Sequence, residues 1–139
     1  MTILDTNVVS ELMRPAPTQA VLRWFQSQPE DEWYVSAITV AEILYGIELL
    51  PQGKRRDALF AGAEKMFSKV FAGHILACDE ETARAFPPIA AARRRGGRPI
   101  SEMDALIAAT AVPLEALLAT RNTDDFEECG VRLINPWEA

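Results

Sequence analysis

Five short apolar runs along the chain have the length and composition of buried β-strands, and turn residues bound them. They lie at residues 2–4, 33–36, 74–77, 117–119 and 131–134. Between them, apolar residues recur at helical spacing, as in Ala20, Val21, Trp24 and Phe25, in Val40, Ile43, Leu44 and Ile47, and in Leu59, Ala63, Met66, Phe67 and Val70. Strands that alternate with helices predict an α/β fold, with a parallel sheet of about five strands and helices on both faces.

Proline and glycine mark the ends of the predicted helices. Residues 14–17 (RPAP) end a first short helix, residues 51–53 (PQG) separate two others, and Gly96-Gly97 ends a basic helix. Pro87 and Pro88 predict that the helical segment beginning near Glu80 is made of two pieces. One of these prolines would then occupy a first turn, where a missing N–H does no harm.

The length and composition indicate one soluble globular domain spanning residues 1–139. The chain is long enough for one hydrophobic core and too short for two ordinary domains. Hydrophobic residues make up 49% and charged residues 24%, the balance of a folded, soluble protein. No basic region precedes an apolar segment at the start, and the most apolar stretch, ALIAATAVPL, is too short for a membrane span and contains Pro113. We therefore expect a cytoplasmic protein without a membrane segment.

Cysteine usage and net charge limit the metal sites and the modes of nucleic-acid binding that the chain can have. Cys78 and Cys129 lie far apart and have only His74 to complete a zinc site, so we expect two buried free thiols. The net charge of -6 argues against a protein that holds nucleic acid by bulk electrostatics. Two basic segments, 53–57 (GKRRD) and 92–98 (ARRRGGR), either contact phosphates or are a solvated helix start and a cationic helix end.

Acidic or amide residues stand where several predicted strands hand over to helices. Asp5 follows the first run, Glu42 lies one turn after the second, Asp104 opens the DALIAAT helix, and 119–126 (ATRNTDDF) follows the fourth run. In a parallel sheet the carboxyl ends of the strands share one edge, where ligands bind. Carboxylates gathered there repel one another unless they are protonated or bind a cation. Oxygen ligands without His or Cys select Mg²⁺ or Mn²⁺.

Helix capping is the alternative explanation for these residues. Three pairs have the spacing of a capping box: Thr39 with Glu42, Ser101 with Asp104, and Asn122 with Asp125. Thr6 and Asn7 could likewise cap a helix over 8–12. Capping explains each residue separately but does not explain their grouping, and an acid in a first turn can serve both roles.

Five segments together resemble the PIN-domain ribonucleases of the VapC toxin type, in the branch similar to FitB. They are ILDTNVVSEL, SAITVAEILYGI, GRPISEMDALIAATA, LLATRNTDDF and NPWEA, and they run over nearly the whole chain in the family's order and spacing. The resemblance implies a three-layer PIN-like domain. It also implies that Asp5 and Asp104 hold a metal, and that Glu42 binds a second ion or a metal-bound water. Thr6 and Asn7 would orient these ligands.

The fourth acid of the family follows the ATR motif, and here that position is Asn122. An amide oxygen can position water but contributes no negative charge, so a second metal would be held less firmly. Asp125 or Asp124 is the candidate substitute from the next turn, and the alternative for both is an ordinary acidic helix start.

The activity implied by the resemblance is hydrolysis of RNA phosphodiester bonds by a Mg²⁺- or Mn²⁺-dependent endoribonuclease toxin. The resemblance further implies that the substrate is single-stranded or looped RNA and that cleavage leaves a 5′-phosphate. A VapB-type antitoxin would hold the protein inactive, and an acidic cleft suits a basic inhibitor tail. The family also forms homodimers and contacts promoter DNA only through the antitoxin.

Two other functions fit parts of the sequence. A phospho-receiver domain also gathers acids at strand ends, but it needs neighbouring acids after the first strand and a late Lys, where this chain has Asp5-Thr6 and Arg121-Asn122. A PIN scaffold that binds RNA or protein without cutting it is compatible with Asn122.

Overall fold

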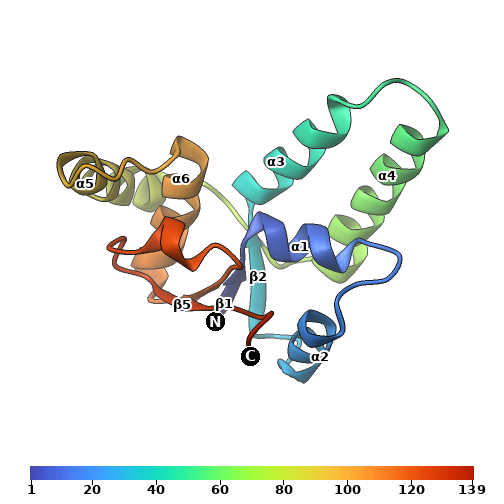
Figure 1. Cartoon of the computed structure of the whole chain (residues 1–139), viewed down its shortest axis with the longest axis horizontal. Coiled ribbons are helices and arrows are strands. Elements are labelled where there is room, and N and C mark those ends of the chain that lie inside the picture. Colours follow the sequence, from blue (N-terminus) through green and yellow to red (C-terminus); the bar gives the residue numbers. More distant parts are fainter.

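A five-stranded parallel sheet runs through the centre of the computed structural model, which describes residues 1–139 (Figure 1). The strands are β1 (Thr2–Leu4), β2 (Trp33–Ser36), β3 (Ile75–Leu76), β4 (Leu117–Ala119) and β5 (Arg132–Ile134). Their order is β3-β2-β1-β4-β5, and every neighbouring pair is parallel. The first strand of the chain is therefore the middle strand of the sheet, with β2 and β4 on its two sides.

Helices cover both faces of the sheet. They are α1 (Thr6–Leu12), α2 (Gln19–Ser27), α3 (Ala37–Glu48), α4 (Lys54–Lys65), α5 (Glu80–Arg95) and α6 (Glu102–Ala111), with the short helices η1 (Met66–Val70), η2 (Val112–Leu114) and η3 (Thr123–Phe126). Leu4 faces a core that includes residues of α1 to α4, whereas its neighbour Ile3 faces a core that includes residues of α5 and α6. This alternation along β1 makes the fold three-layered.

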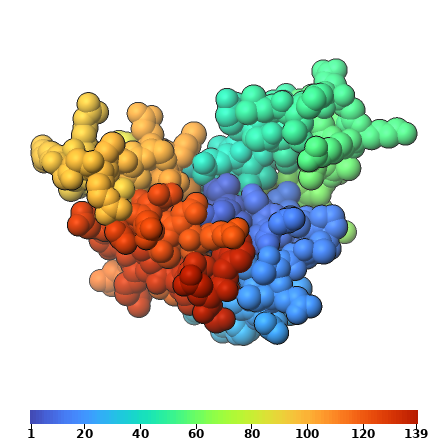
Figure 2. All heavy atoms as spheres, viewed as in Figure 1, coloured from blue at the N-terminus to red at the C-terminus, as the bar shows by residue number.

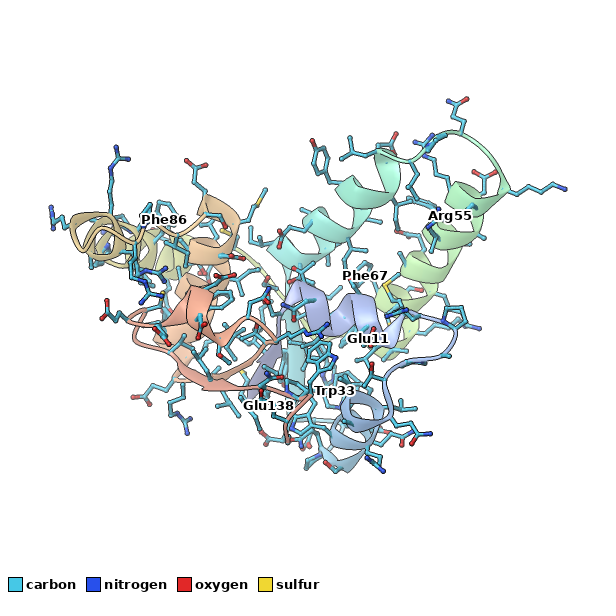
Figure 3. All side chains as sticks on the ribbon, viewed as in Figure 1. Glu11, Trp33, Arg55, Phe67, Phe86 and Glu138 are labelled. Carbon is cyan, nitrogen blue, oxygen red and sulfur yellow. The ribbon has the colours of Figure 1, made fainter.

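Aromatic side chains fill the core on the α1–α4 side. Trp33 packs against Phe25 at a ring-centroid distance of 4.9 Å and edge-on against Phe71 at 5.2 Å. Phe67 of η1 lies 6.5 Å from Phe71 and continues this cluster toward α4 (Figure 3). These large buried rings fix α2 and the end of α4 against the sheet.

The predicted α/β class and the five strands are confirmed, with small differences at two strands. The third strand covers only Ile75–Leu76 of the predicted 74–77, and it begins after His74 because the His74 N–H donates to the Phe71 carbonyl at 2.8 Å in the preceding turn. The fifth strand begins at Arg132.

The prediction that the segment from Glu80 is two pieces is wrong. One helix, α5, runs from Glu80 to Arg95 with Pro87 and Pro88 inside it. The Asp79 side chain caps its start by accepting from the Thr82 N–H at 3.0 Å. Buried Ile89 packs in the core that α5 shares with α6, and this packing holds the helix together despite two missing N–H donors.

Two other predictions were tested by the structure. Both cysteines are free, and Cys129 is buried as predicted, but Cys78 is exposed because it lies in the loop between β3 and α5. None of the helices has both the length and the apolar character that crossing a membrane requires.

The helices form two arms that rise beyond the sheet. Helices α3 and α4 make one arm and α5 and α6 the other, and α1 lies beneath the arm of α3 and α4 (Figure 1). The space-filling view shows a hollow between the two arms, with the N-terminal part of the chain at its base (Figure 2). The carboxyl ends of β1 and β2 lead directly into α1 and α3, so the residues at these two junctions lie at this side of the sheet.

We predict that Leu118→Ala lowers the free energy of unfolding by about 2–5 kcal/mol, because Leu118 is fully buried in β4 and its removal leaves a cavity. The matched control is Leu114→Ala, whose leucine is 42% exposed and should change stability by less than about 0.5 kcal/mol. Urea unfolding of both variants is the measurement. Equal effects would contradict the assignment of β4 to the interior.

Candidate functional site

Asp5 stands at the carboxyl end of the middle strand and is almost fully buried, with 4% of its surface exposed. Its side chain caps α1 by accepting from the Thr6 N–H at 2.8 Å. The Thr120 hydroxyl donates to its other oxygen at 2.8 Å, and the Asn7 amide donates to that oxygen at 3.2 Å. The carboxylate is therefore held in one orientation by donors from α1 and from the end of β4.

Burial dominates the protonation of Asp5. It raises the pKa from 3.8 to about 6, although the hydrogen bonds from Thr120 and from the Thr6 N–H oppose the rise. The negative charges of Asp104 and Glu42 add to it. Asp104 and Glu42 therefore lie near enough to Asp5 for their charges to act on its carboxylate. A cation bound beside Asp5 and Asp104 would favour the ionised form of both.

Glu42 is held by Thr6 of α1, and the alternative explanation of Glu42 as a capping residue is excluded. Helix α3 begins at Ala37, and Ser36, not Thr39, is its cap, accepting from the Thr39 N–H at 3.1 Å. Glu42 thus lies in the second turn, beyond the reach of a capping box. Its carboxylate accepts from the Thr6 hydroxyl at 2.7 Å. The same hydroxyl lies 3.1 Å from that of Thr39, so Thr6 links the starts of α1 and α3.

Contrary to our prediction, Asp104 does not follow a strand but lies at the start of a helix that follows another helix. Helix α6 follows α5 through residues 96–101 and not a strand, so Asp104 is not at a strand-to-helix junction. Ser101 caps α6, as predicted, by accepting from the Asp104 N–H at 3.2 Å. Burial raises the pKa of the Asp104 carboxyl, a hydrogen bond to Ser101 lowers it, and the charges of Glu42 and Asp125 raise it.

Asn122 and Asp125 stand on an exposed turn. Asn122 precedes η3, and its side chain does not cap that helix, so the alternative explanation by a capping box is excluded here too. The Asp125 carboxylate lines a cavity of about 220 Å³ together with Asp104 and Ser101. Asn122, Asp124 and Asp125 line a second, wholly polar cavity of about 400 Å³. Of the two acids, Asp125 is therefore the one that shares a cavity with Asp104.

Thr6 and Asn7 orient the acids and do not cap α1. Asp5 provides the cap, which excludes the predicted alternative for these two residues. Asn7 donates to Asp5 and accepts from the Arg121 N–H at 3.2 Å. The segment after β4 is thereby tied to the start of α1.

Thr120 is a site residue that the sequence prediction missed. It is fully buried and donates to Asp5, while the Asn122 N–H donates to its hydroxyl at 3.0 Å. A signal for it exists in the sequence, since Thr120 is the first polar residue after the run 117–119, as Asp5 is after 2–4. The register pairs Leu4 with Ala119, so the next residues, Asp5 and Thr120, meet at the sheet edge.

The side chains do not close a ready-made cage. No three His, Cys, Asp or Glu side chains converge closely enough to hold a metal ion by themselves. The charges of these acids nevertheless interact, because those of Asp104 and Glu42 raise the pKa of Asp5, and that of Glu42 raises the pKa of Asp104. This donor set of carboxylate, amide and hydroxyl oxygens suits a hard cation that keeps part of its water shell.

Known proteins with similar sequences identify the family of this chain. A family model described as PIN domain matches residues 2–131. The VapC ribonuclease Y4jK of Sinorhizobium fredii is 41% identical over 138 residues, which cover 99% of each chain. The toxin FitB of Neisseria gonorrhoeae is 40% identical over 137 residues, again 99% of each chain.

A solved structure has the same fold. In the structure of FitAB bound to IR36 DNA fragment, a chain 40% identical to this one superposes with a TM-score of 0.88, over 99% of this chain and 96% of that chain. Matches of this extent leave no room for the phospho-receiver alternative. The chain belongs to the PIN-domain family, in the group that contains the VapC ribonuclease Y4jK and the toxin FitB.

Proposed function

We propose that this protein is a Mg²⁺- or Mn²⁺-dependent endoribonuclease toxin that a cognate antitoxin neutralises. The observation that carries the proposal is the buried Asp5 carboxylate, whose pKa is raised to about 6 by burial and by the charges of Asp104 and Glu42. Acids of a folded protein that destabilise one another at a cleft indicate a functional site. The relatedness to a VapC ribonuclease and to the toxin FitB supports RNA hydrolysis as that function.

Some residues of the chain would bind the ion, and others orient the residues that bind it. Asp5, Asp104 and Glu42 would hold the ion, and Asp125 stands next to Asp104 to add charge where Asn122 adds none. Thr120 and Asn7 fix the orientation of Asp5, and Thr6 fixes that of Glu42. A bound divalent ion supplies Lewis acidity toward the phosphate and lowers the pKa of a water.

A groove next to the acids is the proposed seat of the antitoxin. A cavity of about 350 Å³ between α1 and α3 has Thr6 and Glu42 in its wall and is otherwise mostly apolar. It shares Met13, Pro15 and Leu59 with a second cavity of about 410 Å³ along α4. A partner segment with an apolar face and a basic end fits such a groove, because its cation would reach the acids. The structure of FitAB bound to IR36 DNA fragment, which contains a similar chain, supports the expectation of a protein partner.

The competing function is a PIN scaffold that binds RNA or protein without cutting it. It shares the fold and the groove but requires no divalent ion. RNA cleavage by protein freed of its partner, measured with Mn²⁺ and with EDTA, separates the two functions.

We predict that Asp5→Asn and Asp104→Asn each lower RNA cleavage by orders of magnitude, because each removes an anionic ligand while preserving the shape of the side chain. The readout is cleavage of total RNA in Mn²⁺, with circular dichroism to verify folding. Asp124→Asn is the matched control, since this exposed acid lies on η3 and does not line the cavity of Asp104. Full activity of Asp5→Asn would contradict the mechanism.

For Glu42, we predict that Glu42→Gln loses most of the cleavage activity with little change in melting temperature. The helix cap is Ser36, so the carboxylate has no capping role that would explain a loss. Glu48→Gln on the same helix is the control and should leave activity intact. If Glu42→Gln cleaves like the wild type, Glu42 does not act in the reaction.

The pKa of Asp5 predicts how metal-free stability depends on pH. In EDTA the folded state keeps a proton on Asp5 that the unfolded state has lost, so stability should fall as pH rises from about 4 to about 6. Above pH 6 the cost from Asp5 reaches about 3 kcal/mol, and Asp5→Asn should recover most of it. Chemical unfolding of both proteins between pH 4 and 7.5 measures this difference. A wild-type curve parallel to that of Asp5→Asn would contradict it.

A further inference from the structure

Arg93 is a buried cation at the wall of the proposed active site. Only 5% of its surface is exposed, although it belongs to the basic segment 92–98 that the sequence analysis assigned to solvent or to phosphates. The other arginines of this segment, Arg94, Arg95 and Arg98, are exposed. Burying a guanidinium is unfavourable unless its charge and its donors find partners, so its surroundings need an explanation.

The donors of Arg93 are largely satisfied by backbone carbonyls. Its Nε donates to the Arg98 carbonyl at 2.7 Å, and Nη1 donates to the carbonyls of Asp125 at 2.7 Å and Glu127 at 3.1 Å. Nη1 also lies 3.5 Å from the Cys129 thiol. These bonds join the loop before α6 to the turn that carries Asp125, and they fix the guanidinium in one orientation.

The charge of Arg93 is not neutralised by an ion pair. Carbonyl oxygens accept hydrogen bonds from Arg93 but carry no net charge. Arg93 takes part in none of the five ion pairs of the chain. Its third nitrogen, Nη2, makes no hydrogen bond within the chain. No buried side-chain nitrogen or oxygen lacks a partner, so Nη2 is accessible.

The surface that Arg93 reaches is the cavity of about 220 Å³ that Ser101, Asp104 and Asp125 also line. We propose that Arg93 binds a phosphate oxygen of the RNA in this cavity, beside Asp104. A planar guanidinium held in place by carbonyls suits phosphate and loses little freedom on binding. The proposal rests on the proposed function, in which a cation on the acids makes the cavity tolerant of an anion.

A purely structural role is the competing explanation. Arg93 would then act only as a link between two loops, and its replacement would change stability without a specific effect on RNA. Arg98 offers a matched control, because it joins the same two segments from the exposed side. It donates to the Glu127 carboxylate at 3.0 Å and to the Asp124 carbonyl at 3.1 Å, but it does not line the cavity.

The test measures binding of a fluorescein-labelled single-stranded RNA oligonucleotide by anisotropy, across KCl concentrations and with Mg²⁺ present. All variants carry Asp5→Asn to prevent cleavage. Adding Arg93→Gln should weaken binding about tenfold or more and reduce the slope of log K against log salt by about 0.7, the value for one phosphate contact to a single strand. Arg98→Gln should change affinity by about twofold at most, because Arg98 is exposed and already paired.

Arg93→Lys is a second variant, chosen in case Arg93→Gln does not fold, because an ammonium keeps the charge and can still donate to the carbonyls. It should nevertheless bind RNA several-fold more weakly, since it lacks the planar second edge of a guanidinium. If the Asp5→Asn parent binds RNA but folded Arg93→Gln and Arg93→Lys match its affinity and salt slope, the Arg93 proposal fails alone. If the parent does not bind RNA and the wild type does not cut it, the proposed function fails as well.

Discussion

The buried carboxylate of Asp5 at the end of the middle strand is the constraint on which the site depends. A charge in this position needs donors, and the chain provides them from three places: the Thr6 N–H at the start of α1, the Asn7 amide and the Thr120 hydroxyl after β4. Hydrogen bonds favour the ionised form and burial disfavours it, and burial prevails. The fold therefore keeps a carboxylate that destabilises it in the absence of a cation, which is the arrangement expected where function and stability compete.

The sheet order explains how distant acids come to surround Asp5. With β1 in the middle, β2 brings the start of α3 and Glu42 to one side, and β4 brings Thr120 to the other. Asp104 arrives from the opposite layer, at the start of α6. The two arms of helices thus contribute one acid each, Glu42 and Asp104, and the hydrogen bond from Thr6 to Glu42 connects the α3 arm to the start of α1.

Local sequence signals were sufficient for the strands and for the placement of Asp5 at the end of the first of them. Apolar runs bounded by turn residues located all five strands, because parallel strands buried on both faces are almost uniformly apolar. Capping was harder to predict. Ser36 and Thr39 both have a hydroxyl that could cap a helix. Ser36 is the cap because β2 leads directly into α3, which begins at Ala37. Thr120 and Arg93 depend on tertiary contacts, since the first acts through a residue 115 positions away and the second through carbonyls. The continuous α5 likewise reflects packing against α6, which outweighs the local effect of Pro87 and Pro88.

The central claim is that burial and acidic neighbours raise the pKa of Asp5 well above the ordinary value for aspartate until a divalent ion binds. The most direct test is NMR titration of the Asp5 carboxyl carbon in the isolated protein, first in EDTA and then in excess Mg²⁺. The account predicts a pKa of about 6 without metal. It also predicts that Mg²⁺ lowers the pKa of Asp5 below the ordinary value for aspartate, because the ion favours the ionised form. A pKa near the ordinary value in EDTA that Mg²⁺ leaves unchanged would contradict the account.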